Sequence, residues 1–218
     1  MVKIMPGRQG QTILQVGLTA VFVGYLMVWL PGPGAGLSFL GIELGEWVKF
    51  MGVGLERNFF YLPPITLALM LVTLTLLWGN GRWQSWAMRG LALLISWQAF
   101  PAIEDITGPA RHEYVPRVQW IALVLLAIVV VAILSWAVKL ETRQWLCWLL
   151  LMVLGLIGAI QPTQVYLQIR PNVAQLLGVS IGYGWGLILN GVGHLLIAGV
   201  SVWQIGQIVG KKRSTPAR

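Results

Sequence analysis

The feature that most constrains this chain is a series of long, uninterrupted apolar stretches. Hydrophobic residues make up 57% of the 218 residues and charged residues only 10%. A chain of this composition has too few polar side chains to cover a core in water, so its solvent must be lipid. A helix that crosses hydrocarbon about 30 Å thick needs roughly 20 apolar residues. Six stretches reach or approach that length: residues 12–30, 60–78, 83–103, 118–138, 145–160 and 183–208.

These stretches predict an all-α, polytopic bundle of six transmembrane helices that forms one membrane domain over residues 1–218. The runs lack the alternation of membrane β-strands, which excludes a transmembrane barrel. The fifth helix is expected to stop at Pro162, because proline removes a backbone hydrogen bond. The loop 161–182 should follow, and its second part, 171–182, is expected to be interfacial or re-entrant. Arg89, in the third stretch, is expected to extend its guanidinium to the headgroups.

The basic residues are distributed unequally between the two sides of such a bundle. Ten Lys or Arg residues fall on the side of the termini and five on the other side. The positive-inside rule therefore predicts that both termini lie in the cytoplasm. Six of the seven acidic residues fall on the opposite, outer side, in the connections 31–58 and 104–117. We expect an integral protein of the cytoplasmic membrane of a prokaryote.

The formal charge of +8 does not indicate nucleic-acid binding. No segment resembles a soluble domain, and the basic tail 209–218 directly follows the last apolar stretch. Its cations Lys211, Lys212 and Arg213 are placed to contact anionic lipids at the membrane surface. The expected partners are therefore the lipid bilayer and other membrane protein subunits.

Residues 37–55 form an amphipathic segment in the first outer connection. The turn residues of 31–36 break the first helix before it. Apolar residues then recur at helical spacing: Leu40, Leu44, Trp47, Val48 and Met51. The charged residues Glu43, Glu46 and Lys49 share much of the opposite side. This pattern predicts an outer interfacial helix that lies on the membrane.

Charged residues of the outer connections form a candidate polar cluster. Its members are Glu43, Glu46, Glu104, Asp105, Arg111, His112 and Glu113. Carboxylates and an imidazole together can bind a hard cation or relay protons. However, adjacent His112 and Glu113 diverge in most backbone conformations, and no two-histidine helical spacing accompanies them. We therefore expect a solvated, ion-paired surface and predict no metal site.

The last apolar stretch carries polar residues among glycines. Asn190 and His194 are four residues apart and so lie on one helix face, with Ser201 near the same face. Small residues flank them, namely Gly186, Gly193 and Ala198. Such a face is typical of close helix packing inside a membrane bundle. Three roles stay open for His194: an interhelical hydrogen bond, a solute or proton site, and axial ligation of a haem or another pigment.

No arrangement of residues typical of catalysis is apparent in the sequence. Asp105 is the only aspartate, and Ser201 is a weak candidate to pair with His194. The single cysteine, Cys147, lies within an apolar stretch and has no partner for an internal disulfide. The sequence therefore predicts a protein that is not an enzyme.

Two functions are compatible with these features. The first is a non-catalytic subunit that packs within a larger membrane assembly, either energy-transducing or associated with a pigment or cofactor. The second is a small solute carrier, or a substrate-capture component, with a site near the outer face around Asn190 and His194. In length, number of spans and polarity, the chain resembles in outline the substrate-capture components of vitamin transporters. That resemblance implies solute binding near the outer face. The absence of a soluble domain favours the first function.

Overall fold

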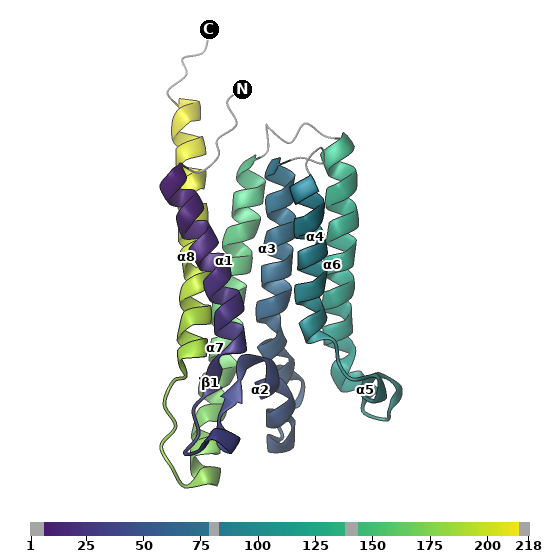
Figure 1. The fold of residues 1–218 in the computed structure, drawn as a ribbon, viewed down its shortest axis with the longest axis vertical. Coiled ribbons are helices and arrows are strands. Elements are labelled where there is room, and N and C mark those ends of the chain that lie inside the picture. The colour runs from purple at the N-terminus through teal and green to yellow at the C-terminus, as the bar shows by residue number, and fades with distance from the viewer. Residues whose placement is uncertain (1–6, 79–82, 138–143, 214–218) are drawn as a thin grey trace.

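The long helices of the protein form an antiparallel bundle. The computed structural model describes residues 7–78, 83–137 and 144–213. Its long helices are α1 (Arg8–Leu26), α3 (Leu62–Trp78), α4 (Trp83–Ser96), α6 (Arg111–Ala137), α7 (Gln144–Leu177) and α8 (Trp185–Arg213). They run side by side and alternate in direction along the chain, so α1 begins at the same end of the bundle at which α8 finishes (Figure 1). We call this end the terminal end, and the predicted helical bundle is confirmed.

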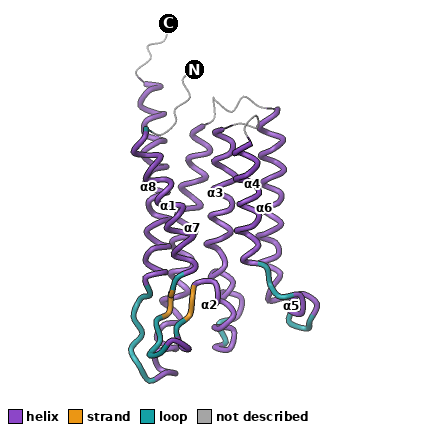
Figure 2. The backbone as a smooth tube through the Cα atoms, in the orientation of Figure 1, coloured by secondary structure: helices purple, strands orange, loops and turns teal. Residues whose placement is uncertain are grey.

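The opposite end, which we call the loop end, carries the short elements. These are β1 (Val28–Leu30), η1 (Ala35–Leu37), β2 (Phe39–Leu40), α2 (Gly41–Trp47), η2 (Val48–Met51), η3 (Gly54–Tyr61), η4 (Trp97–Ala99) and α5 (Ile103–Thr107). The strands β1 and β2 form a small antiparallel sheet beside α2 (Figure 2). The predicted continuous helix over 37–55 is therefore wrong. Gly52 and Gly54 adopt left-handed φ angles of 69° and 65°, which glycine tolerates and which interrupt a helix.

Among the described residues, four helical segments are long and apolar enough to cross a membrane. They are Gly54–Leu77, Arg111–Ser135, Gln144–Leu177 and Trp185–Gly210. The chain thus has the helix lengths and composition of an integral membrane protein. Neither α1 nor α4 belongs to the four, and α4 has only 14 residues where the sequence predicted a span over 83–103. Its helical conformation stops before Phe100, which is extended because Pro101 follows it.

The helix α7 differs most from the prediction. It has 34 residues and continues through Pro162 and Pro171, so the expected stop at Pro162 is wrong, and residues 171–177 belong to α7 itself. Inside a bundle, neighbouring helices and hydroxyl groups offset the hydrogen bond that a proline removes. Here Pro162 is buried, and the carbonyl that loses its helical partner is that of Gly158. Residues 171–177 extend α7 to the loop end, where Val173 is buried in an apolar cluster with Trp29 and Leu44.

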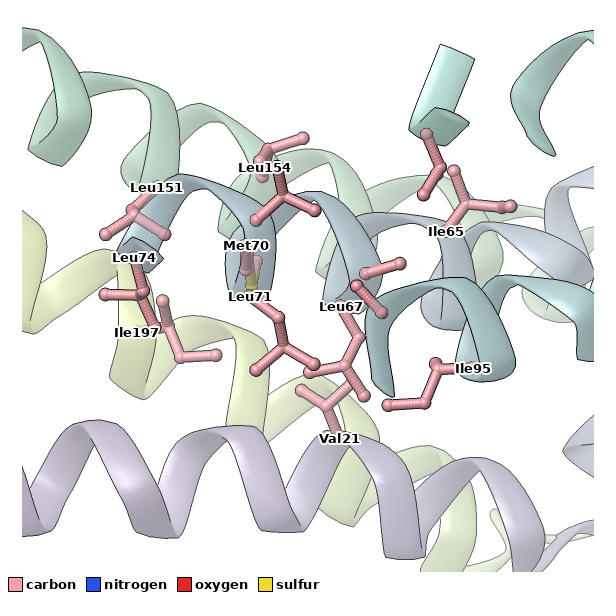
Figure 3. Packing of buried hydrophobic residues seen from close by; sticks show 14 of the residues in the cluster. Val21, Ile65, Leu67, Met70, Leu71, Leu74, Ile95, Leu151, Leu154 and Ile197 are labelled. Carbon is pink, nitrogen blue, oxygen red and sulfur yellow. The ribbon is translucent and has the colours of Figure 1, made fainter. Parts of the chain in front are cut away.

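The helix α3 occupies the centre of the bundle. It packs against α4, α6 and α7, and 89% of its apolar window is buried. Figure 3 shows Leu67 and Leu71 of α3 between Val21 of α1, Ile95 of α4 and the side chains of α7 and α8. Since lipid is as apolar as these side chains, close packing and hydrogen bonds must hold the helices together.

The helices α1 and α8 approach each other through glycines. A Cβ atom added to Gly24 would lie 2.5 Å from the backbone nitrogen of Asn190, and one added to Gly193 would lie 2.7 Å from the carbonyl oxygen of Gly17. Gly186 is equally close to α1, with its added Cβ 2.7 Å from the carbonyl oxygen of Gly24. The two backbones are therefore in direct contact at these positions.

Candidate functional site

The side chain of His194 on α8 is fully buried in the bundle. Its Nδ1 lies 3.0 Å from the carbonyl oxygen of Asn190, and its Nε2 lies 2.9 Å from the Thr66 hydroxyl of α3. A carbonyl only accepts hydrogen bonds, so the proton of the neutral ring is assigned to Nδ1. The Thr66 hydroxyl then donates to Nε2, although the carbonyl oxygens of Leu62 and Pro63 also lie within hydrogen-bond distance, at 3.0 Å and 3.1 Å, and share its single proton. Both ring nitrogens are therefore bonded within the chain.

The surroundings of His194 are closely packed. A Cβ atom added to Gly158 of α7 would lie 2.1 Å from the Nε2 atom of His194 and 2.8 Å from the Thr66 hydroxyl. Asn190, one turn before His194, donates from Nδ2 to the carbonyl oxygen of Val21 on α1 at 3.1 Å. Together, Asn190 and His194 link α8 to α1 and α3, with α7 packed against the ring. We call these four residues, Thr66, Asn190, His194 and Gly158, the buried polar site.

The other residues singled out on α8 lie outside this site. The Ser201 hydroxyl donates to the carbonyl oxygen of Ile197 in its own helix at 2.8 Å, so it does not bond His194. Ala198 faces α7, where a Cβ atom added to Gly155 would lie 3.1 Å from its own Cβ. The small residues of α8 therefore serve two contacts, with Gly186 and Gly193 toward α1 and Ala198 toward α7.

Replacing Thr66 with valine should destabilise the bundle by about 1–3 kcal/mol, because it leaves the buried Nε2 of His194 without a partner. The measurement is the unfolding free energy in mixed detergent micelles. Thr73→Val is the matched control, since the Thr73 hydroxyl bonds only the Leu69 carbonyl of its own helix. Equal effects of the two substitutions would contradict the role of the Thr66–His194 bond.

A second set of polar side chains lies at the loop end. Glu46 of α2 accepts hydrogen bonds from Arg117 of α6 and from the Tyr61 hydroxyl at 3.0 Å, and it pairs with Arg57 at 3.5 Å. Arg57 also pairs with Glu113 of α6 at 3.0 Å. The side chains of Arg57 and Arg117 are only 1% and 3% exposed. We call these five residues the loop-end network, and they connect α2, η3 and α6.

Aromatic rings and a backbone carbonyl complete the environment of Arg117. Its Nε donates to the carbonyl oxygen of Ala99 at 2.8 Å, and its guanidinium lies 3.6 Å from the centre of the Tyr61 ring. A buried cation needs such partners, since its loss of hydration is otherwise uncompensated.

Burial alone would raise the pKa of Glu46, but the hydrogen bond and charge of Arg117, together with Tyr61 and Arg57, hold that pKa below its ordinary value of 4.5.

The lowered pKa of Glu46 predicts a loss of stability in acid. A carboxylate with a lower pKa in the folded state stabilises the protein above its unfolded pKa, and the stabilisation is lost as the pH falls through the folded value. The melting temperature of the detergent-solubilised protein should therefore decrease below about pH 4.5. In Glu46→Gln the melting temperature should start lower at pH 7 and depend less on pH. Parallel curves for the two proteins would contradict this assignment.

The structure brings together only part of the predicted outer polar cluster. Glu46 and Glu113 meet through Arg57, but Glu43 instead accepts a hydrogen bond from the backbone nitrogen of Leu40 at 3.1 Å and caps α2. The other four members form no ion pair with the described residues. Glu104 and Asp105 lie in the first turn of α5. Arg111 and His112 are exposed residues at the start of α6.

The sequence did not identify Arg57, Tyr61 and Arg117 as site residues. Arg57 and Arg117 counted only as charges of the outer connections, and Tyr61 as part of the second predicted span. A signal was present, because Arg57 and Arg117 each lie within four residues of a tyrosine and the connections that hold them are rich in acids. Arginines that stack on aromatic rings and pair with carboxylates are typical of buried ion-pair networks.

The structure adds a feature of Arg89 that the sequence did not predict. Its side chain is 2% exposed and is buried among helices. Nε donates to the Thr75 hydroxyl of α3 at 3.1 Å, and Nη2 donates to the Ser135 hydroxyl of α6 at 3.3 Å. The cation is thus held between three helices.

The metal-ligating side chains of the described residues are scattered over the fold. Within residues 7–78, 83–137 and 144–213, no three His, Cys, Asp or Glu side chains gather closely enough to hold a metal ion. The predicted lipid contacts fall on side chains that the structure does not describe, namely Lys211, Lys212 and Arg213. The same holds for the charged residues Lys3, Lys139, Glu141 and Arg143. Comparisons of this chain with protein-family models, with curated proteins and with solved structures found no match.

Proposed function

We propose that this chain is a non-catalytic integral membrane subunit that packs within a larger membrane protein assembly. The observation that supports this function most is the saturation of the buried polar site. Both ring nitrogens of His194 are bonded within the chain, and Gly158 leaves no room beside the ring. A carrier site needs donors or acceptors that face a cavity, and an axial ligand needs a free ring nitrogen. As arranged here, His194 serves helix packing instead.

The exposed surface of α6 gives further support. Only 17% of its apolar window is buried within the chain, against 89% for the segment that contains α3. Large side chains are exposed along one side of α6, and they are Leu123, Leu126, Val130 and Ile133. In a membrane, this side meets either lipid or a helix of another chain, and purification of the native particle distinguishes the two.

The proposed topology has six crossings with both termini in the cytoplasm of a prokaryote. It adds α1 and α4 to the four long apolar segments, in keeping with the alternating direction of the helices (Figure 1). The only cysteine is Cys147, so single cysteines can be introduced in a Cys147→Ala background. A cysteine at Phe50, which is 81% exposed at the loop end, should react with an impermeant maleimide in intact cells. A cysteine at Arg8 should react only after permeabilisation, and the opposite pattern would invert the topology.

Native purification tests the proposed function. A tagged chain extracted in mild detergent should elute with stoichiometric partner chains and a protein mass well above its own 24.1 kDa. Ile133→Trp on α6, at a position that is 60% exposed, should reduce partner recovery without changing the melting temperature of the isolated chain. Val202→Trp, at an exposed position of α8, is the matched control. The proposal fails if the chain elutes alone and a soluble solute raises its melting temperature in a manner that His194→Ala abolishes.

A further inference from the structure

Arg89 is a buried cation whose hydrogen bonds are incomplete. Within the described part of the chain, its Nη1 atom has no hydrogen-bond partner, and the partners of its other nitrogens, the Thr75 and Ser135 hydroxyls, carry no charge. The guanidinium lies 4.7 Å from the centre of the Trp86 ring, which covers one face of the cation. Among the described residues, the ion pairs all belong to the loop end and none includes Arg89. A buried guanidinium with an unbonded nitrogen and no paired charge is destabilised by its lost hydration, and an anionic partner would offset that loss.

A groove of about 430 Å³ opens at this cation between α4 and α6. Arg89, Trp86 and Gly90 line it on the α4 side, and apolar side chains that include Leu125 and Val129 line it on the α6 side. Gly90 contributes to the space, since a Cβ atom added there would meet no other atom within 4 Å. The groove is therefore apolar apart from one cation.

The groove has the polarity and direction of a phospholipid. Ser135, which bonds Arg89, is two residues before the end of α6 at the terminal end of the bundle, where headgroups would lie. Leu125 is ten residues earlier, or roughly 15 Å closer to the middle of the bilayer at about 1.5 Å per residue. The cation thus sits at the headgroup side of the groove, and the apolar walls extend toward the acyl region.

From this arrangement we propose that the groove between α4 and α6 binds one anionic phospholipid of the leaflet at the terminal end. The free Nη1 of Arg89 donates to a phosphate oxygen, and an acyl chain lies over Gly90 against α6. The guanidinium forms strong charge-assisted hydrogen bonds to phosphate, which explains why an arginine is placed here without a carboxylate. A headgroup with net negative charge is preferred because the site itself is positive.

Native mass spectrometry of the full chain, released from nanodiscs of defined composition, tests the proposal. With phosphatidylglycerol and phosphatidylcholine at equal amounts, the wild type should retain one phosphatidylglycerol in preference, by roughly tenfold. Arg89→Gln should remove the preference. Gly90→Leu fills the groove while keeping the cation and should lower phosphatidylglycerol retention by a similar factor. Gly199→Leu, at another glycine with open space around it, should retain the lipid as the wild type does.

Four outcomes would overturn the site. Equal retention of the two lipids by the wild type would exclude a charge-selective site, and full retention by Gly90→Leu would place the lipid elsewhere. If glycerol phosphate without acyl chains competes as well as the whole lipid, the ligand is a soluble phosphate compound. A preference that appears only in Glu141→Gln would mean that this carboxylate, outside the described residues, is the partner of Arg89. Because Gly90→Leu keeps Arg89 in place, the test does not depend on the folding of Arg89→Gln.

Discussion

Replacing Glu46 with alanine should destabilise the folded protein by about 3 kcal/mol at pH 7. The substitution removes the carboxylate that faces two buried guanidinium groups, and removal of one partner from a buried ion pair typically costs about 3–5 kcal/mol. We expect the lower end of that range because the Glu46 side chain is itself 36% exposed, so water screens part of the charge. Reversible unfolding in mixed detergent micelles measures the change.

The control for this substitution is Glu56→Ala, at an exposed acid of η3 that forms no ion pair among the described residues. It should change the unfolding free energy by less than about 0.5 kcal/mol. A similar loss in the two variants would show that Glu46 acts only through the overall charge of the loop end. Arg117→Leu combined with Glu46→Leu should recover part of the loss, since the Arg117 guanidinium is then no longer buried without its carboxylate. The recovery is partial because the Tyr61 hydroxyl and Arg57 still lose Glu46 as a partner.

Gly24→Ala should also cost about 3 kcal/mol, at the upper end of the range for overpacked cores. The new methyl would lie 2.5 Å from the backbone nitrogen of Asn190 and 2.8 Å from the carbonyl oxygen of Gly186. These are backbone atoms of α8 and cannot rotate away, so α1 and α8 must separate. The separation also lengthens the bond from Asn190 to the Val21 carbonyl. Thermal melting and unfolding in mixed micelles report the loss.

The matched control is Gly199→Ala, because a Cβ atom at Gly199 would meet no atom within 4 Å. Alanine favours helix over glycine by about 1 kcal/mol, so this variant should be as stable as the wild type or more stable. If the two alanine variants behave alike, the contact between α1 and α8 is looser than described.

Most of the helices could be predicted from the sequence, since their apolar runs are continuous and only helices satisfy backbone groups in lipid. The ends were harder to predict. Pro162 predicts the end of a helix, an interpretation suited to water, yet α7 continues through Pro162 and also through Pro171. The segment 37–55 has helical periodicity, but the left-handed conformations of Gly52 and Gly54 depend on tertiary contacts that periodicity does not contain.

The candidate sites were only partly predictable. Asn190 and His194 were identified because polar residues in an apolar run are conspicuous, but the choice of Thr66 as partner depends on how α3 and α8 are juxtaposed. Thr66, Thr73 and Thr75 were equivalent in the sequence, and only the fold selects one of them. The loop-end network joins residues up to 71 positions apart, which no local pattern encodes.

The contact between α1 and α8 has a consequence for biogenesis. The bond between Asn190 and Val21 joins residues 169 positions apart, so α1 leaves the ribosome well before α8 and finds its partner only when α8 has been synthesised. Until then, the glycine face of α1 lacks this contact and is available to insertion factors or to helices of other nascent chains. Truncation before α8 should therefore leave an N-terminal helix without its main contact, and quality-control proteases should remove such products quickly.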